Sequence, residues 1–334
     1  MINSNWRNAK ASKILSIVPL LVIATGILFI GPAHQKAVAA RSQIAEAASE
    51  VGPAVARVEV TKTVETQIPE MLKDPFFRYF FGEPPKKERE VQGLGSGFAI
   101  SWQGKKYVLT NQHVVAHAKE IRLVFPEDKT FKAKVIGGDE MMDVAVLEIT
   151  KSLYGSEVED LPVLELGDSS ETPVGAWLVA VGNPIGFQNT VTAGVLSAKN
   201  RTIPHPKGEG SYINMLQTDA SINPGNSGGP LVNTEGEVIG INTLIIRQNR
   251  QGTPLTGLNF AISVDSVKKV LPEIIKEGEV DRAWLGVYIQ KLTAKMSTKF
   301  GVAPGEGVLV AEVVQDSPAD KAGIKAGDLI TEVS

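Results

Sequence analysis

Short apolar runs separated by glycine, proline and charged residues fill most of the chain, which is the pattern of β-strands joined by turns. Ala56 to Val60 alternates apolar with charged positions, and a turn at 102–105 separates the runs Gly97 to Ser101 and Lys106 to Thr110. Further strands are predicted at 121–125, 133–136, 144–149, 177–181, 190–196, 215–218, 230–233, 238–245 and 259–262. Short strands at this spacing indicate a sandwich or a barrel.

Two segments carry a helical pattern. A short helix is predicted at 42–51, between a serine that can cap its start and the Gly52-Pro53 pair that ends it. A longer helix is predicted at 264–276, where the apolar residues fall near one face, with a bend at Pro272. We expect this longer helix to end the first domain.

The N-terminal residues have the pattern of an export segment. Three basic residues, the last of them Lys13, precede the uncharged apolar run Ile14 to Ile30, and Ala37-Val38-Ala39 then offers a small-x-small cleavage site. Residues 1–40 are therefore predicted to be a signal peptide or an N-terminal membrane anchor. Because basic residues ahead of an apolar run stay inside, both alternatives place the rest of the chain outside the cytoplasm.

An insertion at 68–90 interrupts the strand pattern and contains the aromatic run Pro75 to Gly82. Its aromatic side chains match neither the period of a strand nor that of a helix. Two interpretations stay open. The run is either a small apolar cluster that pins the loop, or an exposed contact surface for another subunit or a regulatory element.

Composition narrows the possible chemistry. The 334 residues carry 34 Lys and Arg against 37 Asp and Glu, a formal net charge of -3, so the basic surface that a nucleic-acid partner requires is not expected. The absence of cysteine excludes disulfides, thiolate metal sites and cysteine nucleophiles. The histidines and carboxylates have no metal-ligand spacing, so neither a metal nor a cofactor is predicted. Catalysis must then use oxygen or nitrogen side chains.

Ser227 lies in the run Gly225 to Pro230, where glycines let backbone N–H groups converge beside a side-chain oxygen, as a nucleophile requires. All four histidines precede Ser227, which excludes the α/β-hydrolase order with histidine last. The subtilisin order fails because the only aspartate ahead of His113 is Asp74, which lies in the aromatic insertion. The chymotrypsin order of His, Asp and Ser fits.

His113 is the predicted base, since it is placed at the end of the strand 107–110 and lies between apolar residues. Asp143 is its predicted partner, because it opens an apolar strand where a partly buried carboxylate needs a hydrogen-bond donor. Asp219 is the rival, although its position suits a bond to loop backbone. The aspartates between His113 and Ser227 are Asp128, Asp139, Asp143, Asp160, Asp168 and Asp219.

Several runs resemble the HtrA/Deg (protease Do) family of serine proteases, from about residue 43 to the end of the chain. These runs are Gly95-Ser96-Gly97-Phe98, Thr110 to Val115, Asp143 to Leu147, Gly182-Asn183-Pro184 and Thr218 to Leu231. The resemblance implies an all-β, chymotrypsin-like double β-barrel at 41–280 with a regulatory loop at 64–92. It also implies that His113 is the base, Asp143 its orienting partner and Ser227 the nucleophile. The implied oxyanion hole comes from the backbone of Gly225, Asn226 and Ser227.

Near the C-terminus, Trp284-Leu285-Gly286-Val287 resembles the carboxylate-binding loop that opens a PDZ domain, and 317–330 resembles the middle of one. By this resemblance a peptide would join the strand Val287 to Gln290. A PDZ domain is longer than residues 281–334, so we expect a partial PDZ domain of the α+β class there.

The resemblance implies an ATP-independent serine endopeptidase that cleaves unfolded or damaged envelope proteins in the periplasm through an acyl-enzyme. A chaperone-like protein that holds unfolded chains, with hydrolysis secondary, is the alternative. An esterase is disfavoured because no feature marks a lipid lid. The family also implies association into trimers or higher oligomers through the Phe-rich loop.

Overall fold

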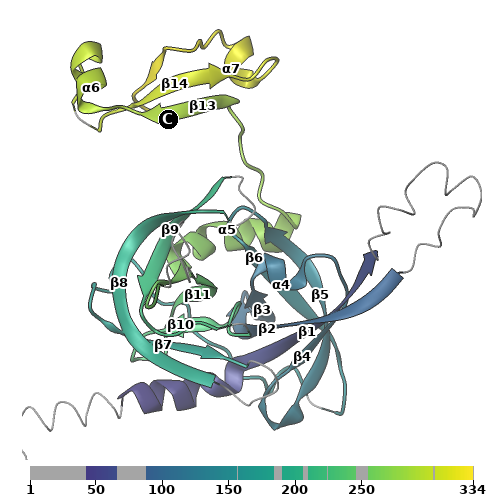
Figure 1. Cartoon of the computed structure of the whole chain (residues 1–334). Helices are drawn as coiled ribbons and strands as arrows, with labels where there is room; N and C mark the ends of the chain where they lie inside the picture. Colours follow the sequence, from purple (N-terminus) through teal and green to yellow (C-terminus); the bar gives the residue numbers. More distant parts are fainter. Residues whose placement is uncertain are drawn as a thin grey trace, which may run out of the picture. The chain divides into compact units, whose positions relative to one another are not determined.

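The computed structural model describes residues 43–65, 88–155, 157–183, 190–205, 210–223, 225–245, 255–303 and 305–333. In these ranges the strands form two closed six-stranded barrels and one three-stranded sheet (Figure 1). The predicted all-β double barrel, followed by a smaller part with helices and strands, is therefore confirmed. The predicted export segment lies outside the described ranges, and within them no helix is long and apolar enough to cross a membrane.

The first barrel pairs its strands in the order β1-β2-β3-β6-β5-β4, all antiparallel. Inward-facing residues on neighbouring strands meet directly, as Val108 and Leu147 do, and both are fully buried. Phe125 and Phe131 pack edge to face in the same core, 5.9 Å between ring centroids. The elements are η1 (Gly52–Ala54), β1 (Val55–Glu65), β2 (Glu88–Trp102), β3 (Lys105–Thr110), α4 (Gln112–Val115), β4 (Ala118–Val124), η2 (Pro126–Asp128), β5 (Thr130–Asp139) and β6 (Val144–Ser152).

Strands β1 and β2 are longer than the apolar pattern predicts. Their pairing continues without a break from Val55 opposite Phe98 to Glu65 opposite Glu88. The outer half of β1 is polar and forms a strand through backbone pairing. Little of it is buried, so no apolar pattern in the sequence predicts it. Strand pairing thus includes residues at both ends of the predicted regulatory loop at 64–92. The aromatic run Pro75 to Gly82 lies outside the described residues.

The second barrel pairs its strands in the order β10-β11-β12-β9-β8-β7. Each apolar run predicted in this half overlaps one strand, but β8 and β9 extend beyond the prediction. Register shifts interrupt their pairing between Leu196 and Ile203, and such bulges break the alternation on which the prediction relied. The strands are β7 (Trp177–Gly182), β8 (Thr190–Pro204), β9 (Ser211–Thr218), β10 (Pro230–Val232), β11 (Val238–Ile245) and β12 (Asn259–Ser263).

One apolar core crosses the seam between the two barrels. It buries Phe98 and Leu109 from the first barrel together with Val179 and Ile241 from the second. Strands of both barrels are anchored in this shared core. The core therefore fixes the relative positions of the polar side chains that project from the ends of these strands.

Helix α5 (Val264–Glu277) follows the second barrel and adds its buried face to the same core. Ser263 caps its start by accepting a first-turn N–H, and Gly278 ends it in the left-handed conformation, φ 88°. Pro272 lies inside the helix without ending it. The amide of Gly138 in β5 donates to the carbonyl of Gly278 at 3.0 Å, so the end of α5 is tied to the first barrel.

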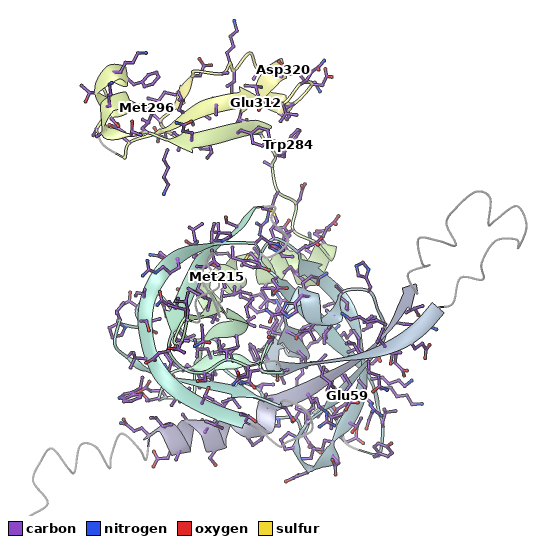
Figure 2. The ribbon with its side chains drawn as sticks, viewed as in Figure 1. Glu59, Met215, Trp284, Met296, Glu312 and Asp320 are labelled. Carbon is purple, nitrogen blue, oxygen red and sulfur yellow. The ribbon has the colours of Figure 1, made fainter. Side chains whose placement is uncertain are left out.

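The C-terminal residues form a sheet of their own in the order β13-β14-β15. The strand predicted to receive a peptide, Val287 to Gln290, makes up nearly all of β13, and Trp284 lies just ahead of it (Figure 2). The elements are β13 (Val287–Lys291), α6 (Ala294–Phe300), β14 (Val308–Val313), α7 (Pro318–Lys321) and β15 (Leu329–Ile330).

Candidate active site

Ser227 lies in a tight loop between β9 and β10. The N–H of Asn226 donates to the carbonyl of Asn223 at 2.9 Å, and Gly225 between them has φ 103°. A positive φ at the third position is the mark of a type II turn, which glycine allows. At Gly228, φ 86°, a Cβ would lie 2.2 Å from the carbonyl oxygen of Ser96, so only glycine fits there. The glycines thus hold the backbone around the serine in one compact shape.

The turn revises the predicted oxyanion hole. Because the N–H of Asn226 is used by the carbonyl of Asn223, it is not free to bind an anion. The amides of Gly225 and Ser227 have no acceptor among the residues that the structure describes. Two backbone donors, rather than the three predicted, are therefore available beside the serine.

His113 and Asp143 are joined by two hydrogen bonds. The ring Nδ1 of His113 lies 2.6 Å from Oδ2 of Asp143, and the backbone N–H of His113 donates to Oδ1 at 2.8 Å. The Asp143 side chain is buried, whereas about half of the His113 side-chain surface is exposed. With Nδ1 turned to the carboxylate, Nε2 is left for a substrate or a nucleophile. His113 belongs to the short helix α4, not to the end of the preceding strand as predicted.

Asp143 adopts the left-handed conformation, φ 62°, which bulky residues avoid. Its carbonyl accepts the side-chain amide of Asn111 at 2.9 Å and the N–H of Gln112 at 3.1 Å. These bonds compensate for the unfavourable backbone conformation and aim the carboxylate at His113. The rival Asp219 accepts the N–H of Val195 at 2.7 Å, a bond to loop backbone.

The hydroxyl of Ser227 donates to the carbonyl of Thr243 at 3.4 Å, a long bond that breaks at little cost. The hydroxyl of Thr243 accepts the side-chain amide of Asn111 at 3.1 Å. Asn111 therefore connects the backbone of Asp143 with the residue that holds Ser227. Sequence reasoning missed both Asn111 and Thr243. The one available signal was that Asn111 is a polar residue directly after an apolar strand and two positions before His113.

Tyr212 lies close enough to this site to interact electrostatically with the Asp143 carboxylate. It is buried in the core that crosses the seam, with its ring centroid 4.7 Å from that of His205. Burial, with a smaller contribution from the Asp143 carboxylate, raises the pKa of Tyr212 to about 12.

The raised pKa predicts a stability difference at alkaline pH. An unfolded tyrosine ionises near pH 10, so protonated Tyr212 stabilises the fold fully below about pH 10, and this contribution is lost as the pH rises towards 12. We expect the free energy of unfolding of the parent chain to fall more steeply over this window than that of Tyr212→Phe. Urea denaturation at about pH 9 and about pH 11 measures the two slopes. Tyr154→Phe at an exposed position is the control, and equal slopes for the parent and Tyr212→Phe would contradict the prediction.

The predicted carboxylate-binding loop is held by backbone bonds. The carbonyl of Leu285 accepts the N–H of Ala319 at 2.9 Å, and that of Gly286 accepts the N–H of Val314 at 2.9 Å. Gly286 has φ 81°, and a Cβ there would lie 2.2 Å from Cβ of Ser317. Within the described part of the chain, β13 pairs only with β14, so its other edge is open.

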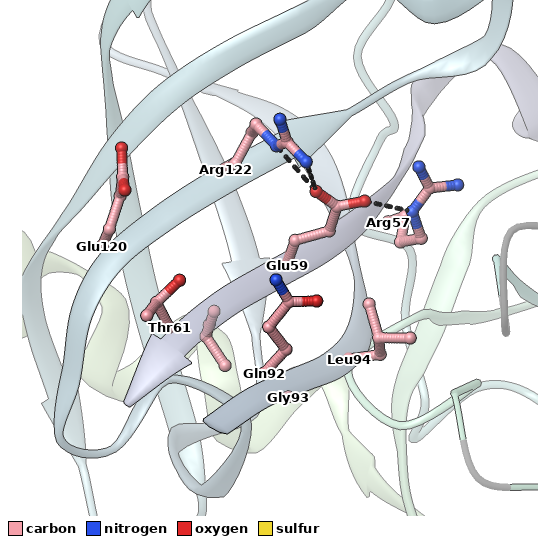
Figure 3. A pocket seen from close by; sticks show the side chains of 9 residues that line it. Arg57, Glu59, Thr61, Gln92, Gly93, Leu94, Glu120 and Arg122 are labelled. Atoms are coloured by element: carbon pink, nitrogen blue, oxygen red, sulfur yellow. Dashed lines mark hydrogen bonds and ion pairs between the residues drawn. The ribbon is translucent and has the colours of Figure 1, made fainter. Parts of the chain in front are cut away.

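A hollow of about 480 Å³ lies on the outer face of the first barrel and does not involve the residues above (Figure 3). Glu59 within it accepts hydrogen bonds from Nε of Arg57 at 2.8 Å and Nε of Arg122 at 2.7 Å. Burial alone would raise the pKa of Glu59, but the bonds from the two arginines outweigh it and lower that pKa. The charge of the Glu59 carboxylate is thus balanced by the two arginines within the hollow. A structural role explains these residues without a bound ligand.

Comparison with known proteins gives matches to both parts of the chain. Residues 95–241 match the family model of a trypsin-like peptidase domain, and residues 309–334 match that of a PDZ domain. A DegP-like periplasmic serine endoprotease of Hahella chejuensis is 47% identical over 268 residues, which cover 80% of this chain and 53% of that relative. A serine protease of Synechocystis is 41% identical over 300 residues, 87% of this chain and 68% of the relative. The chain thus spans between half and about two thirds of the length of these relatives.

Solved structures give the same picture. A variant of the HtrA-type protease AlgW, solved with a decapeptide, matches with a TM-score of 0.70 at 36% identity. The match covers 86% of this chain and 83% of that one. Likeness at this identity and coverage extends through the barrels and beyond them.

Proposed function

We propose that this chain, which belongs to the HtrA family of serine endoproteases, hydrolyses peptide bonds in unfolded or damaged proteins of the cell envelope. The observation that carries the proposal is the pair of hydrogen bonds between His113 and Asp143. The seam between the two barrels also holds Ser227, in its glycine-rich loop. The substrate class is supported by the relatives, which include proteins named periplasmic endoproteases.

In the proposed mechanism Ser227 Oγ attacks the scissile carbonyl while Nε2 of His113 takes its proton. Asp143 holds the imidazole through Nδ1 and stabilises the charge that forms on it. The amides of Gly225 and Ser227 donate to the oxyanion. His113 then gives the proton to the leaving amine, and water repeats the sequence on the acyl-enzyme to release the second product.

Hydrolysis of an unfolded protein tests this proposal. We expect the purified chain to cleave casein without ATP, and a fluorophosphonate to stop cleavage and form a single adduct at Ser227. Casein that binds without being cut would favour the alternative, a chaperone-like protein. Cleavage that resists the fluorophosphonate would remove Ser227 as the nucleophile.

We also propose that the chain acts outside the cytoplasm and associates with copies of itself. Export is supported by the basic and apolar segments of residues 1–40, whether they are cleaved or kept as an anchor. Association is supported by the Phe-rich run 75–82, whose aromatic residues are too many to leave in water on one loop. The trimeric form of the assembly is proposed from the resemblance to the family.

A third proposal assigns carboxylate binding to Trp284, Leu285, Gly286 and Val287, with the bound peptide pairing along the open edge of β13. Gly286→Ala should weaken binding of a peptide with a hydrophobic C-terminal residue at least about tenfold, because its Cβ would collide with Ser317 and deform the loop. Isothermal titration measures the affinity.

Gly323→Ala is the matched control for this third proposal. It places an alanine at the similar φ of 82° but in open space, so it carries the same backbone strain without the collision. Equal loss of affinity in Gly286→Ala and Gly323→Ala, or equal binding of a peptide with an amidated C-terminus, would contradict the assignment.

A further inference from the structure

Ser96 is a fully buried polar residue of the first barrel whose hydrogen bonds reach into the serine loop of the second. Its hydroxyl donates to the carbonyl of Gly225 at 2.5 Å and accepts the N–H of Asn183 at 2.8 Å. Its own N–H donates to the carbonyl of Ser227 at 2.9 Å. The hydroxyl of Thr110 donates to the carbonyl of Ser96 at 2.7 Å, which fixes its backbone in turn.

These bonds act on the peptide group that follows Gly225. Its carbonyl is held by the hydroxyl of Ser96, and its N–H, which belongs to Asn226, is held by the carbonyl of Asn223. A peptide group fixed at both ends cannot rotate. This group lies between the two amides that have no acceptor, with the N–H of Gly225 before it and the N–H of Ser227 after it.

We propose that Ser96 is a positioning residue for the oxyanion hole. It touches no substrate. By holding the carbonyl of Gly225, its hydroxyl fixes the peptide group between the two donors, and so keeps the N–H groups of Gly225 and Ser227 in place for the negative charge that develops in the transition state. The inference rests on the proposed endopeptidase function and goes beyond the triad, because it assigns a role to a hydroxyl in the opposite barrel.

The test measures binding of a tetrahedral adduct. Loss of one oxyanion donor costs about 10² to 10³ in kcat, so a misdirected donor in Ser96→Ala should lower kcat about 10- to 100-fold and leave KM nearly unchanged. The Ki of a peptide boronate with an aliphatic side chain should rise by a similar factor, because its adduct with Ser227 carries the charge that the hole binds. Unlike kcat, Ki does not depend on how much of the sample is folded.

Two further variants separate positioning from stability. Ser263→Ala removes another buried hydroxyl, the cap of α5, and should lower the urea midpoint without changing the Ki of the boronate. Ser96→Cys keeps a weak donor, so its Ki should lie between those of the parent and Ser96→Ala. If Ser96→Ala does not fold, the comparison of Ser96→Cys with the parent decides.

The outcomes distinguish this inference from the proposed function. A parent chain that neither cleaves casein nor binds the boronate would overturn the endopeptidase proposal itself. An active parent with an unchanged Ki in Ser96→Ala, or in Ser96→Cys if only that variant folds, would overturn the role of Ser96 alone. A raised KM with kcat unchanged would overturn it as well, since it would place Ser96 in substrate binding.

Discussion

Ser227→Ala is expected to lower the rate of peptide hydrolysis about a millionfold, the loss seen when such a nucleophile is removed. The hydroxyl makes only one long bond, to the carbonyl of Thr243, so the substitution should leave the fold intact. Cleavage of a fluorogenic peptide measures the rate, and thermal denaturation measures the fold. Ser101→Ala at an exposed position of the first barrel is the control and should match the parent. A folded Ser227→Ala chain that keeps more than about a thousandth of the rate would contradict the assignment of the nucleophile.

Asp143→Asn is expected to cost about 10⁴ in kcat. The asparagine keeps the shape, but its amide can donate to Nδ1 of His113, which places the ring proton on Nε2. The imidazole then cannot accept the proton of Ser227. The kcat of the folded variant, determined with the same fluorogenic peptide, measures the effect.

Asp219→Asn is the matched comparison for the acid. Its remaining carbonyl oxygen can still accept the N–H of Val195, so we expect a loss of no more than a few fold. Equal damage from Asp219→Asn and Asp143→Asn, with both folds intact, would show that the wrong carboxylate was chosen.

The strands that the sequence predicted best are those whose ends coincide with a change in polarity. The run 238–245 begins where β11 begins, because the turn residues 234–237 precede an apolar stretch there. The helix predicted at 264–276 differs from α5 by one residue, since its apolar face and its closing glycine agree. The family indicated by the motifs is likewise confirmed by relatives that match most of the chain.

The elements that the sequence did not predict depend on contacts between distant residues. The outer half of β1 is a strand because it pairs with β2, not because it is apolar. The short helix that carries His113 was hidden because its amides bond to the loop that bears Asp143. Hydrogen bonds of this kind leave no period in the sequence.

The residue types of the candidate site and their order followed from the sequence, and their catalytic roles remain predictions. Its supporting bonds did not follow, because Ser96 and Gly225 are 129 residues apart and Asn111 and Thr243 are 132 residues apart. The inclusion of Asn226 in the oxyanion hole stays a prediction, and the bond from its N–H to the carbonyl of Asn223 argues against it. A glycine-rich run indicates that amides can converge, but it does not tell which of them are already used inside a turn.

The core shared by the two barrels limits how this protein can be regulated. Many enzymes with two lobes open and close about a hinge when a ligand binds. Here Phe98 from one barrel and Val179 from the other are buried in one cluster. Rotation of one barrel against the other would expose this apolar surface to water, at a free-energy cost of about 25 cal/mol per Å². A ligand that switches activity on or off is therefore expected to leave the two barrels where they are, and to act by some route other than a hinge between them.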